Sequence, residues 1–161
     1  MKRFRRGLTW ALLVTSASTC LVLSQDFGQT DHWIGIWKLN VARSKFEAGP
    51  LPINSTMTFQ ETPGGVKVTN DWVNALGQSN HIEFTARYDG TPVPLQNFRS
   101  TISIKRIDTY TFDVTQHSDD GFMITTRHMV SPDRKTLTSS QTVTMSDGVK
   151  LINMSVFDRQ P

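Results

Sequence analysis

The sequence predicts an all-β fold, in which a single antiparallel meander closes into a barrel of about eight to ten strands. From Ile34 onward the chain consists of short runs in which apolar and polar residues alternate, which is the pattern of half-buried strands. Turn-forming residues break these runs at regular intervals, and no long window has helical periodicity. Closure is expected because a long open meander would expose two strand edges.

Ten runs are predicted to be strands, and turn residues separate most of them. Pairs such as Asp-Gly and Gly-Gly supply the backbone conformations that tight hairpins require. Turns are expected at 63–65, 74–77, 89–90, 119–121, 132–133 and 147–148. The predicted strands are residues 34–39, 55–60, 66–73, 81–88, 91–95, 101–107, 110–117, 122–130, 136–145 and 149–159.

Alternation within the predicted strands indicates which side chains share a face. In 81–88 the apolar face carries Ile82, Phe84, Ala86 and Tyr88. In 110–117 it carries Tyr110, Phe112 and Val114. The last strand has apolar residues on both faces, so its inward face stays open at this point. A helix is expected at most over 41–46, because Gly49 and Pro50 would end it.

Residues 1–24 have the three parts of a secretory signal peptide: a basic start, an apolar stretch and a small-residue exit at Val22-Leu23-Ser24. The apolar stretch has about 16 residues, fewer than the roughly 20 that span a bilayer. We therefore expect cleavage near Ser24, a secreted or periplasmic protein, and no stable membrane insertion after the leader is removed. The alternative is an inner-membrane anchor formed by the uncleaved leader. Residues 25–161 would form one barrel domain.

Cysteine content and charge narrow the possible functions. Cys20, the only cysteine, lies in the leader, so the mature chain would have no disulfide and no thiolate metal site. The leader also holds four of the 17 Lys and Arg residues, which leaves fewer basic residues than the 14 Asp and Glu. Without a surviving basic stripe, nucleic acid is excluded as a partner.

Two motifs resemble a known family. The opening Gly35-Ile36-Trp37-Lys38-Leu39-Asn40, followed by Ala42-Arg43-Ser44-Lys45-Phe46, is similar to that of small secreted bacterial lipocalin-like (calycin-type) β-barrel proteins. The later Ser131-Pro132-Asp133-Arg134-Lys135-Thr136 resembles their SPDGKT turn, with Arg134 in the place of Gly. The resemblance implies a barrel with an interior cavity and a structural Trp37 at the barrel floor. An arginine would stack on that indole, and Arg106 and Arg127 are the candidates.

The opening is also similar to that of intracellular fatty-acid-binding proteins, with two departures. The connection 40–54 is too short for their helix-turn-helix lid. Their carboxylate-binding Arg-x-Tyr is missing near the C-terminus, where the chain reads Val156-Phe157-Asp158-Arg159-Gln160-Pro161. A fatty-acid carboxylate site therefore cannot be transferred from that family by motif.

Several strands carry polar residues on otherwise apolar faces, where they could orient a ligand in an apolar pocket. Arg106 follows Ile104 on one face, and His128 follows Ile124 on another. In the alternative interpretation, these side chains lie near strand ends and reach water at the barrel rim. The candidate ligand-binding residues are Phe84, Tyr88, Arg106, Phe112, Gln116, His128 and Gln141.

No motif indicates a catalytic residue, a metal site or a cofactor. The histidines, at positions 32, 81, 117 and 128, lack metal-ligand spacing, and no serine lies in a nucleophile motif. The sequence therefore predicts an exported barrel that binds a small apolar molecule in its interior. One alternative is an envelope protein-interaction or inhibitor module with a filled core, which contacts a protein partner through 40–54 and through 95–100 with Phe98. Another is an acid–base enzyme that uses Arg106 and His128.

Overall fold

An antiparallel sheet of eleven strands makes up most of the computed structural model, which describes residues 30–96 and 98–161. The expected leader, 1–24, lies outside the described residues. All ten predicted strands are present, and the all-β prediction is confirmed. Within the described part of the chain, no helix is long and apolar enough to cross a membrane.

The strands differ from the predicted ranges by a few residues at their ends. The region 41–46, where a short helix was expected at most, forms a 3-10 turn, η1 (Val41–Arg43), and a two-residue strand, β2 (Lys45–Phe46). The other strands are β1 (Gly35–Leu39), β3 (Asn54–Thr62), β4 (Gly65–Val73), β5 (Ser79–Arg87), β6 (Val93–Pro94), β7 (Ser100–Arg106), β8 (Thr111–Ser118), β9 (Met123–Val130), β10 (Thr136–Thr144) and β11 (Lys150–Arg159).

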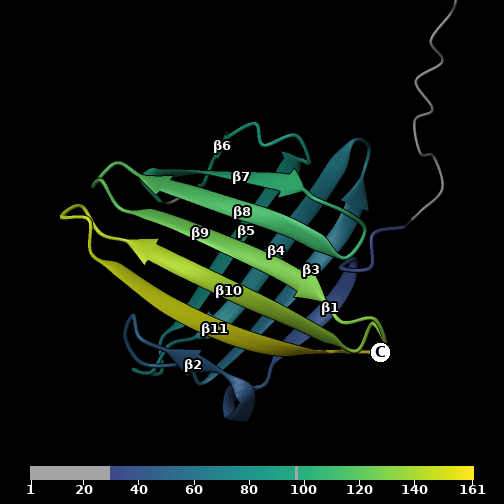
Figure 1. Cartoon of the computed structure of the whole chain (residues 1–161), viewed down its shortest axis with the longest axis horizontal. Helices are drawn as coiled ribbons and strands as arrows, with labels where there is room; N and C mark the ends of the chain where they lie inside the picture. Colours follow the sequence, from purple (N-terminus) through teal and green to yellow (C-terminus); the bar gives the residue numbers. More distant parts are fainter. Residues whose placement is uncertain (1–29, 97) are drawn as a thin grey trace, which may run out of the picture.

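The sheet curls into a nearly closed barrel. Ten strands follow the order β5-β4-β3-β1-β11-β10-β9-β8-β7-β6, and β2 pairs with β11 beyond the end of β1. Figure 1 shows β7 to β11 crossing in front of β3, β4 and β5, so the two groups of strands form opposite walls. After β5 the chain bends toward β7: the Arg106 amide donates to Tyr88 O at 3.0 Å, and the Gly90 amide donates to Ile104 O at 2.8 Å. These bonds join the two ends of the sheet.

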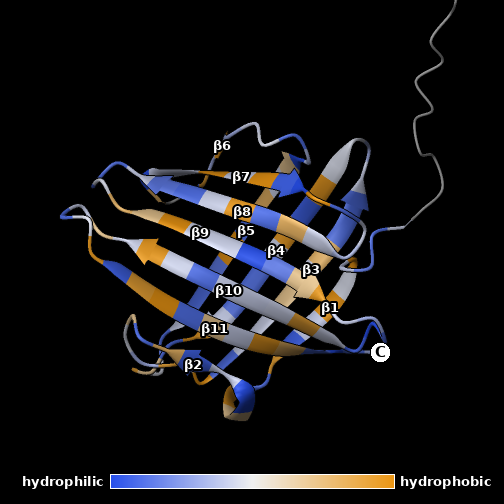
Figure 2. Ribbon diagram, in the orientation of Figure 1, coloured by the Kyte–Doolittle hydropathy of each residue, from blue (hydrophilic) through white to orange (hydrophobic). Residues whose placement is uncertain are grey.

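Side chains alternate between the interior and the surface, as the colouring along the strands in Figure 2 reflects. The predicted inward faces of 81–88 and 110–117 are confirmed, with Ala86 and Phe112 in the buried core. In β11 the inward face is the one that carries Asn153 and Phe157, whereas Ile152 is 57% exposed. This settles the face that the sequence left open.

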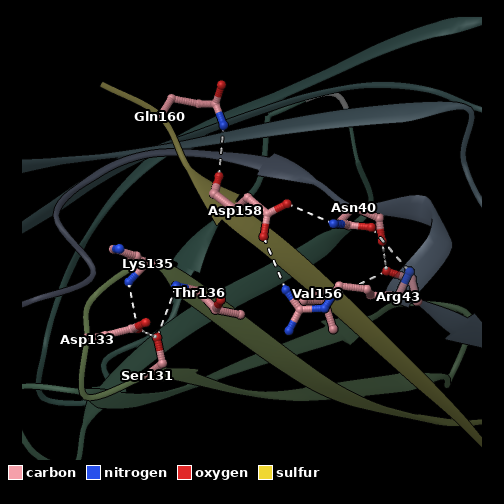
Figure 3. A network of polar contacts seen from close by, with 10 residues as sticks. Asn40, Arg43, Ser131, Asp133, Lys135, Thr136, Val156, Asp158 and Gln160 are labelled. Carbon is pink, nitrogen blue, oxygen red and sulfur yellow. Dashed lines mark hydrogen bonds and ion pairs between the residues drawn. The ribbon is translucent and has the colours of Figure 1, made fainter.

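The second half of the first resemblance motif, residues 40–46, runs along the edge of β11 and is hydrogen-bonded to it. Figure 3 shows part of this contact. η1 bulges away from the edge of β11 and interrupts its pairing with β1 and β2. The Ser44 hydroxyl fills the gap by accepting a hydrogen bond from the Val156 amide at 3.0 Å and donating to Asn40 O at 2.8 Å. Asn40 and Arg43 donate to the Asp158 carboxylate at 2.8 and 3.3 Å.

The second motif forms the β9–β10 turn, also drawn in Figure 3. The Ser131 hydroxyl accepts a hydrogen bond from the Thr136 amide at 3.0 Å, and the Asp133 carboxylate accepts one from the Lys135 amide at 3.1 Å. Arg134 has φ = 60°, the left-handed conformation that glycine adopts more readily. The first motif therefore contributes both to the contact with β11 and to the barrel interior, where Trp37 and Leu39 are buried, whereas the second motif forms a turn between two strands.

Candidate ligand-binding cavity

An arginine and a tryptophan close one end of the barrel, called here the closed end. Trp37 is fully buried, and its indole N–H donates to Trp33 O at 2.7 Å. The guanidinium carbon of Arg159 lies 4.2 Å from the Trp37 ring centroid. Arg159 also donates hydrogen bonds to three backbone oxygens: Ile34 O at 3.0 Å, Arg134 O at 2.7 Å, and His32 O.

The glycine of the GxW motif makes room for this arginine. Gly35 has φ = 133°, a conformation that other residues rarely adopt. A Cβ at this position would lie 2.7 Å from a terminal nitrogen of Arg159. Gly35 therefore leaves room for the Arg159 guanidinium to reach the backbone oxygens of Ile34 and His32.

The prediction that Arg127 belongs to the barrel floor is wrong. Arg127 lies between the inward residues Thr126 and His128, so strand alternation directs it outward. Its side chain is 58% exposed and makes two hydrogen bonds of 2.8 Å with Asp113. The arginine on Trp37 is Arg159, which the pairing of β1 with β11 places there.

Two of the predicted ligand-binding residues, Arg106 and Tyr88, are engaged at the closed end and do not line the cavity. Arg106 Nε lies 3.0 Å from Asp31 Oδ1, without the alignment of a hydrogen bond. Burial raises the pKa of Asp31 to about 6, although the Arg106 charge acts in the opposite direction. Tyr88 packs edge-on against Trp33, and burial raises its pKa to about 12. The side chains of Arg106 and Tyr88 are therefore held at the closed end by contacts with Asp31 and Trp33.

An aromatic layer separates the closed end from the cavity. Phe112 is 1% exposed, with its ring centroid 4.8 Å from that of Trp33 and 5.4 Å from that of Phe59. On another side it stacks on His128, with centroids 4.6 Å apart. Phe112, also predicted to bind ligand, is thus a packed core residue because rings surround it.

Beyond this layer the barrel is hollow. The cavity has a volume of about 370 Å³ and opens to solvent at the other end of the barrel, called the mouth. Four predicted ligand-binding residues line it: Phe84, Gln116, His128 and Gln141. The remaining lining residues are Leu39, Phe46, Pro52, Ser55, Met57, Phe59, Val68, Asn70, Trp72, Ile82, Ile102, Val114, Ile124, Thr126, Ser139, Ser155 and Phe157.

One side of the cavity is polar, and its residues come from three adjacent strands. Ser139 on β10 is in register with His128 on β9 and with Ser155 on β11. Toward the mouth, Gln141 on β10 is in register with Thr126 on β9. These five residues are called the polar wall. Sequence analysis identified His128 and Gln141 but missed the other three, because Ser and Thr are also common on exposed strand faces.

The opposite side of the cavity, on β3, β4 and β5, is mainly apolar. Met57, Phe59, Val68 and Phe84 project into the cavity there. The polar side chains Ser55 and Asn70 on this side hydrogen-bond to each other at 2.8 Å. The cavity therefore has a polar wall and an apolar wall that face each other.

His128 is the titratable residue of the polar wall. Its Nδ1 lies 2.8 Å from the Ser139 hydroxyl, and burial lowers its pKa to about 4. The ring is therefore neutral at pH 7 and is a weak base. Within the described residues, no carboxylate hydrogen-bonds to His128. The pair thus lacks the oriented, basic imidazole that activates a serine nucleophile, and Arg106 of the acid–base hypothesis lies at the closed end.

The lining residues are uncharged. Among the residues that the structure describes, no Asp, Glu, Lys or Arg side chain lines the cavity. In the same residues, no group of three His, Cys, Asp or Glu side chains gathers closely enough to hold a metal ion. The cavity can therefore bind a ligand through hydrogen bonds and apolar contacts.

Comparison with known proteins gives a limited result. No protein-family model matches the chain, and no curated protein matches it in sequence. Among solved structures, a crystal structure of the zebrafish ileal bile acid-binding protein complexed with cholic acid is similar, with 8% identity and a TM-score of 0.48. The match covers 80% of this chain and 99% of that chain. A likeness of this size assigns neither a family nor a ligand to the chain.

Proposed function

We propose that this protein binds a small apolar molecule inside its barrel. The observation that carries the proposal is the cavity of about 370 Å³, which opens at the mouth and has an apolar wall formed by residues such as Phe59 and Phe84. Its volume lies within the range of small-molecule sites, which runs from roughly 300 to 1,000 Å³. Apolar contact with that wall would supply most of the affinity, because it removes hydrocarbon surface from water.

The test is a fluorescence titration with Nile red, an uncharged apolar dye, on the full chain. Ser155→Phe places a ring in the cavity that Ser155 lines, and the side-chain hydrogen bonds of the cavity's polar side, Ser139–His128 and Gln141–Asn153, do not involve Ser155. We expect saturable binding to the unmodified protein and at least a tenfold loss of affinity in this variant. Met154→Phe is the matched control, because the adjacent Met154 is 38% exposed on the outer surface. Equal binding by both variants would contradict the proposal.

The protein-interaction alternative assumes a filled core, and the hollow interior counts against it. Phe98, which that hypothesis places in the contact surface, is 43% exposed. A single exposed ring of this kind is common on protein surfaces. Ligand binding in the interior is therefore the better supported function.

We further propose that the protein acts after export, with the leader cleaved near Ser24. The signal-peptide pattern of residues 1–24 supports this proposal. Mass spectrometry of the accumulated protein should give an N-terminus close to residue 25 in the periplasmic or secreted fraction. An intact leader in the membrane fraction would support the anchored alternative instead.

A further inference from the structure

We infer that the ligand of this cavity is an uncharged molecule with hydrogen-bonding oxygen or nitrogen atoms along one side, which lie on the polar wall. The inference rests on the proposed function and specifies its ligand class. It excludes ionised fatty acids and other organic anions as the preferred occupants. It also excludes pure hydrocarbons.

The first step is the absence of charge. No cation among the described residues lines the cavity. The nearest arginines at the closed end, Arg106 and Arg159, are already paired with Asp31 and with backbone oxygens. They lie on the far side of the aromatic layer that Trp33 and Phe112 form. A carboxylate in the cavity would therefore lose its hydration without gaining a counter-charge, which is strongly unfavourable.

The second step is the unused hydrogen-bonding capacity of the polar wall. The side-chain hydrogen bonds of the polar wall join Ser139 to His128 and Gln141 to Asn153, and neither involves the Thr126 or Ser155 hydroxyl, although both of these side chains line the cavity. The Gln141 side-chain oxygen accepts from Asn153 at 2.8 Å, which leaves the Gln141 amide nitrogen available as a donor. A purely apolar ligand would displace water from these groups and leave them unsatisfied, at a cost of about 1–3 kcal/mol for each buried group.

The third step is the layout of these groups. The polar wall extends over three adjacent strands in two register positions, from His128 and Ser139 near the aromatic layer to Thr126 and Gln141 toward the mouth. Polar groups therefore run along one side of the cavity, with the apolar wall opposite. This layout fits a molecule whose polar atoms also lie along its length, such as an oxygenated terpenoid or sterol. It fits less well a molecule whose polarity is confined to a charged end.

The experiment measures displacement of Nile red from the full chain at pH 7.5 by 1-dodecanol and by dodecanoate. These competitors share one hydrocarbon chain and differ in charge. The Ser155→Phe variant defines the dye signal from outside the cavity. We expect dodecanol to bind at least tenfold more tightly than dodecanoate. A smaller preference, or the opposite one, would overturn the inference while leaving the proposed function intact.

A double variant tests whether the polar wall makes the contact. Thr126→Val with Ser155→Ala removes both hydroxyls, and we expect a tenfold loss of dodecanol affinity in a variant that far-UV circular dichroism shows to be folded. The matched control is Thr125→Val with Ser140→Ala on the outer face of β9 and the adjacent β10, which should leave dodecanol affinity unchanged. Unchanged dodecanol affinity in the first variant would also overturn the inference.

A gain-of-function variant completes the test. Ser155→Lys adds a cation to the polar wall and should raise dodecanoate affinity at least tenfold. If that variant does not fold, Gln141→Lys nearer the mouth replaces it. Failure of a folded lysine variant to gain dodecanoate affinity would contradict the role given to charge. By contrast, Nile red binding that is equal in the unmodified and Ser155→Phe proteins would contradict the proposed function itself.

Discussion

At the scale of single residues, Arg159 contributes most to the closed end. Its guanidinium stacks on Trp37 and donates to backbone oxygens of Ile34 and Arg134. These bonds tie the last strand to the segment before β1 and to the β9–β10 turn. One side chain thus connects three parts of the chain that are distant in sequence.

We predict that Arg159→Ala lowers the free energy of unfolding by about 3 kcal/mol, because charge-assisted hydrogen bonds are lost and the part-buried carbonyls of Ile34 and His32 lose their donor. Urea denaturation monitored by tryptophan fluorescence measures the change. Arg127→Ala is the control, since it breaks only an exposed ion pair with Asp113, which water screens and which should contribute much less to stability. Equal losses in the two variants would refute the assignment of Arg159 to the floor.

The role of Trp37 could be expected from its motif, whereas its arginine was misassigned. Alternation in 122–130 already placed Arg127 on the face opposite His128, so local periodicity argued against it. Arg159 was obscure because both faces of the last strand are apolar, and the partner of Trp37 depends on the pairing of β1 with β11. Pairing between the two ends of a chain has no local signature.

At the scale of elements, β1, η1 and β2 form one interrupted strand along β11. Ser44 replaces the missing strand partner at the interruption by accepting a hydrogen bond from the Val156 amide. Asn40 donates its own amide to Val156 O at 2.8 Å. Both backbone groups of Val156 are satisfied in this way, although η1 leaves the sheet.

We predict that Ser44→Ala lowers the free energy of unfolding by about 1–3 kcal/mol, because the Val156 amide becomes a buried donor without an acceptor. Hydrogen exchange at Val156 should accelerate more than exchange elsewhere in β11. Ser140→Ala, on an exposed position of β10, should change stability by less than about 0.5 kcal/mol. Unchanged exchange at Val156 in the Ser44 variant would show that the hydroxyl is not the acceptor.

The long strands follow from their period of two, which several residues reinforce in each case. β2 could not be predicted in this way, because a strand of two residues has no period. Its position is set by the free edge of β11, where Phe46 is in register with Asn153. The short strand β2 is therefore determined by tertiary pairing.

At the scale of the whole molecule, two buried groups give the stability opposite dependences on pH. The folded-state pKa of Asp31 is about 6, above its ordinary value of 3.8. As pH rises through this interval the unfolded chain ionises first, so stability falls. The folded-state pKa of His128 is about 4, below its ordinary value of 6.5. The unfolded chain then holds the extra proton, and stability rises over nearly the same interval.

We predict that the two effects largely cancel in the unmodified protein between pH 4 and 6.5. Each contributes up to about 3 kcal/mol, at roughly 1.4 kcal/mol per pKa unit. Asp31→Asn should therefore give a free energy of unfolding that rises with pH, and His128→Gln one that falls. Urea denaturation at pH 4.5, 5.5 and 6.5 measures the three profiles. Parallel profiles for both variants would refute this account.

The barrel could be predicted from strand pattern and its interior cavity from the family resemblance, but the pattern could not separate the residues that line the cavity from those that pack in the core. Closure follows from strand number and turn spacing, whereas a cavity depends on how inward side chains from opposite walls meet. Phe112 and Phe84 both lie on inward faces, yet Phe112 packs in the aromatic layer and Phe84 lines the cavity. The two residues differ in their position along the barrel axis, and the register between strands sets that position.

The polar wall has a consequence for how this protein can change through evolution. Its five residues come from three consecutive strands, β9, β10 and β11, and therefore lie within one continuous stretch of the chain, 126–155. Exchange of that segment by recombination would change the polar wall and with it the ligand preference. The apolar wall on β3, β4 and β5 would stay the same. Descendants of such a protein could diversify in selectivity without redesigning their scaffold.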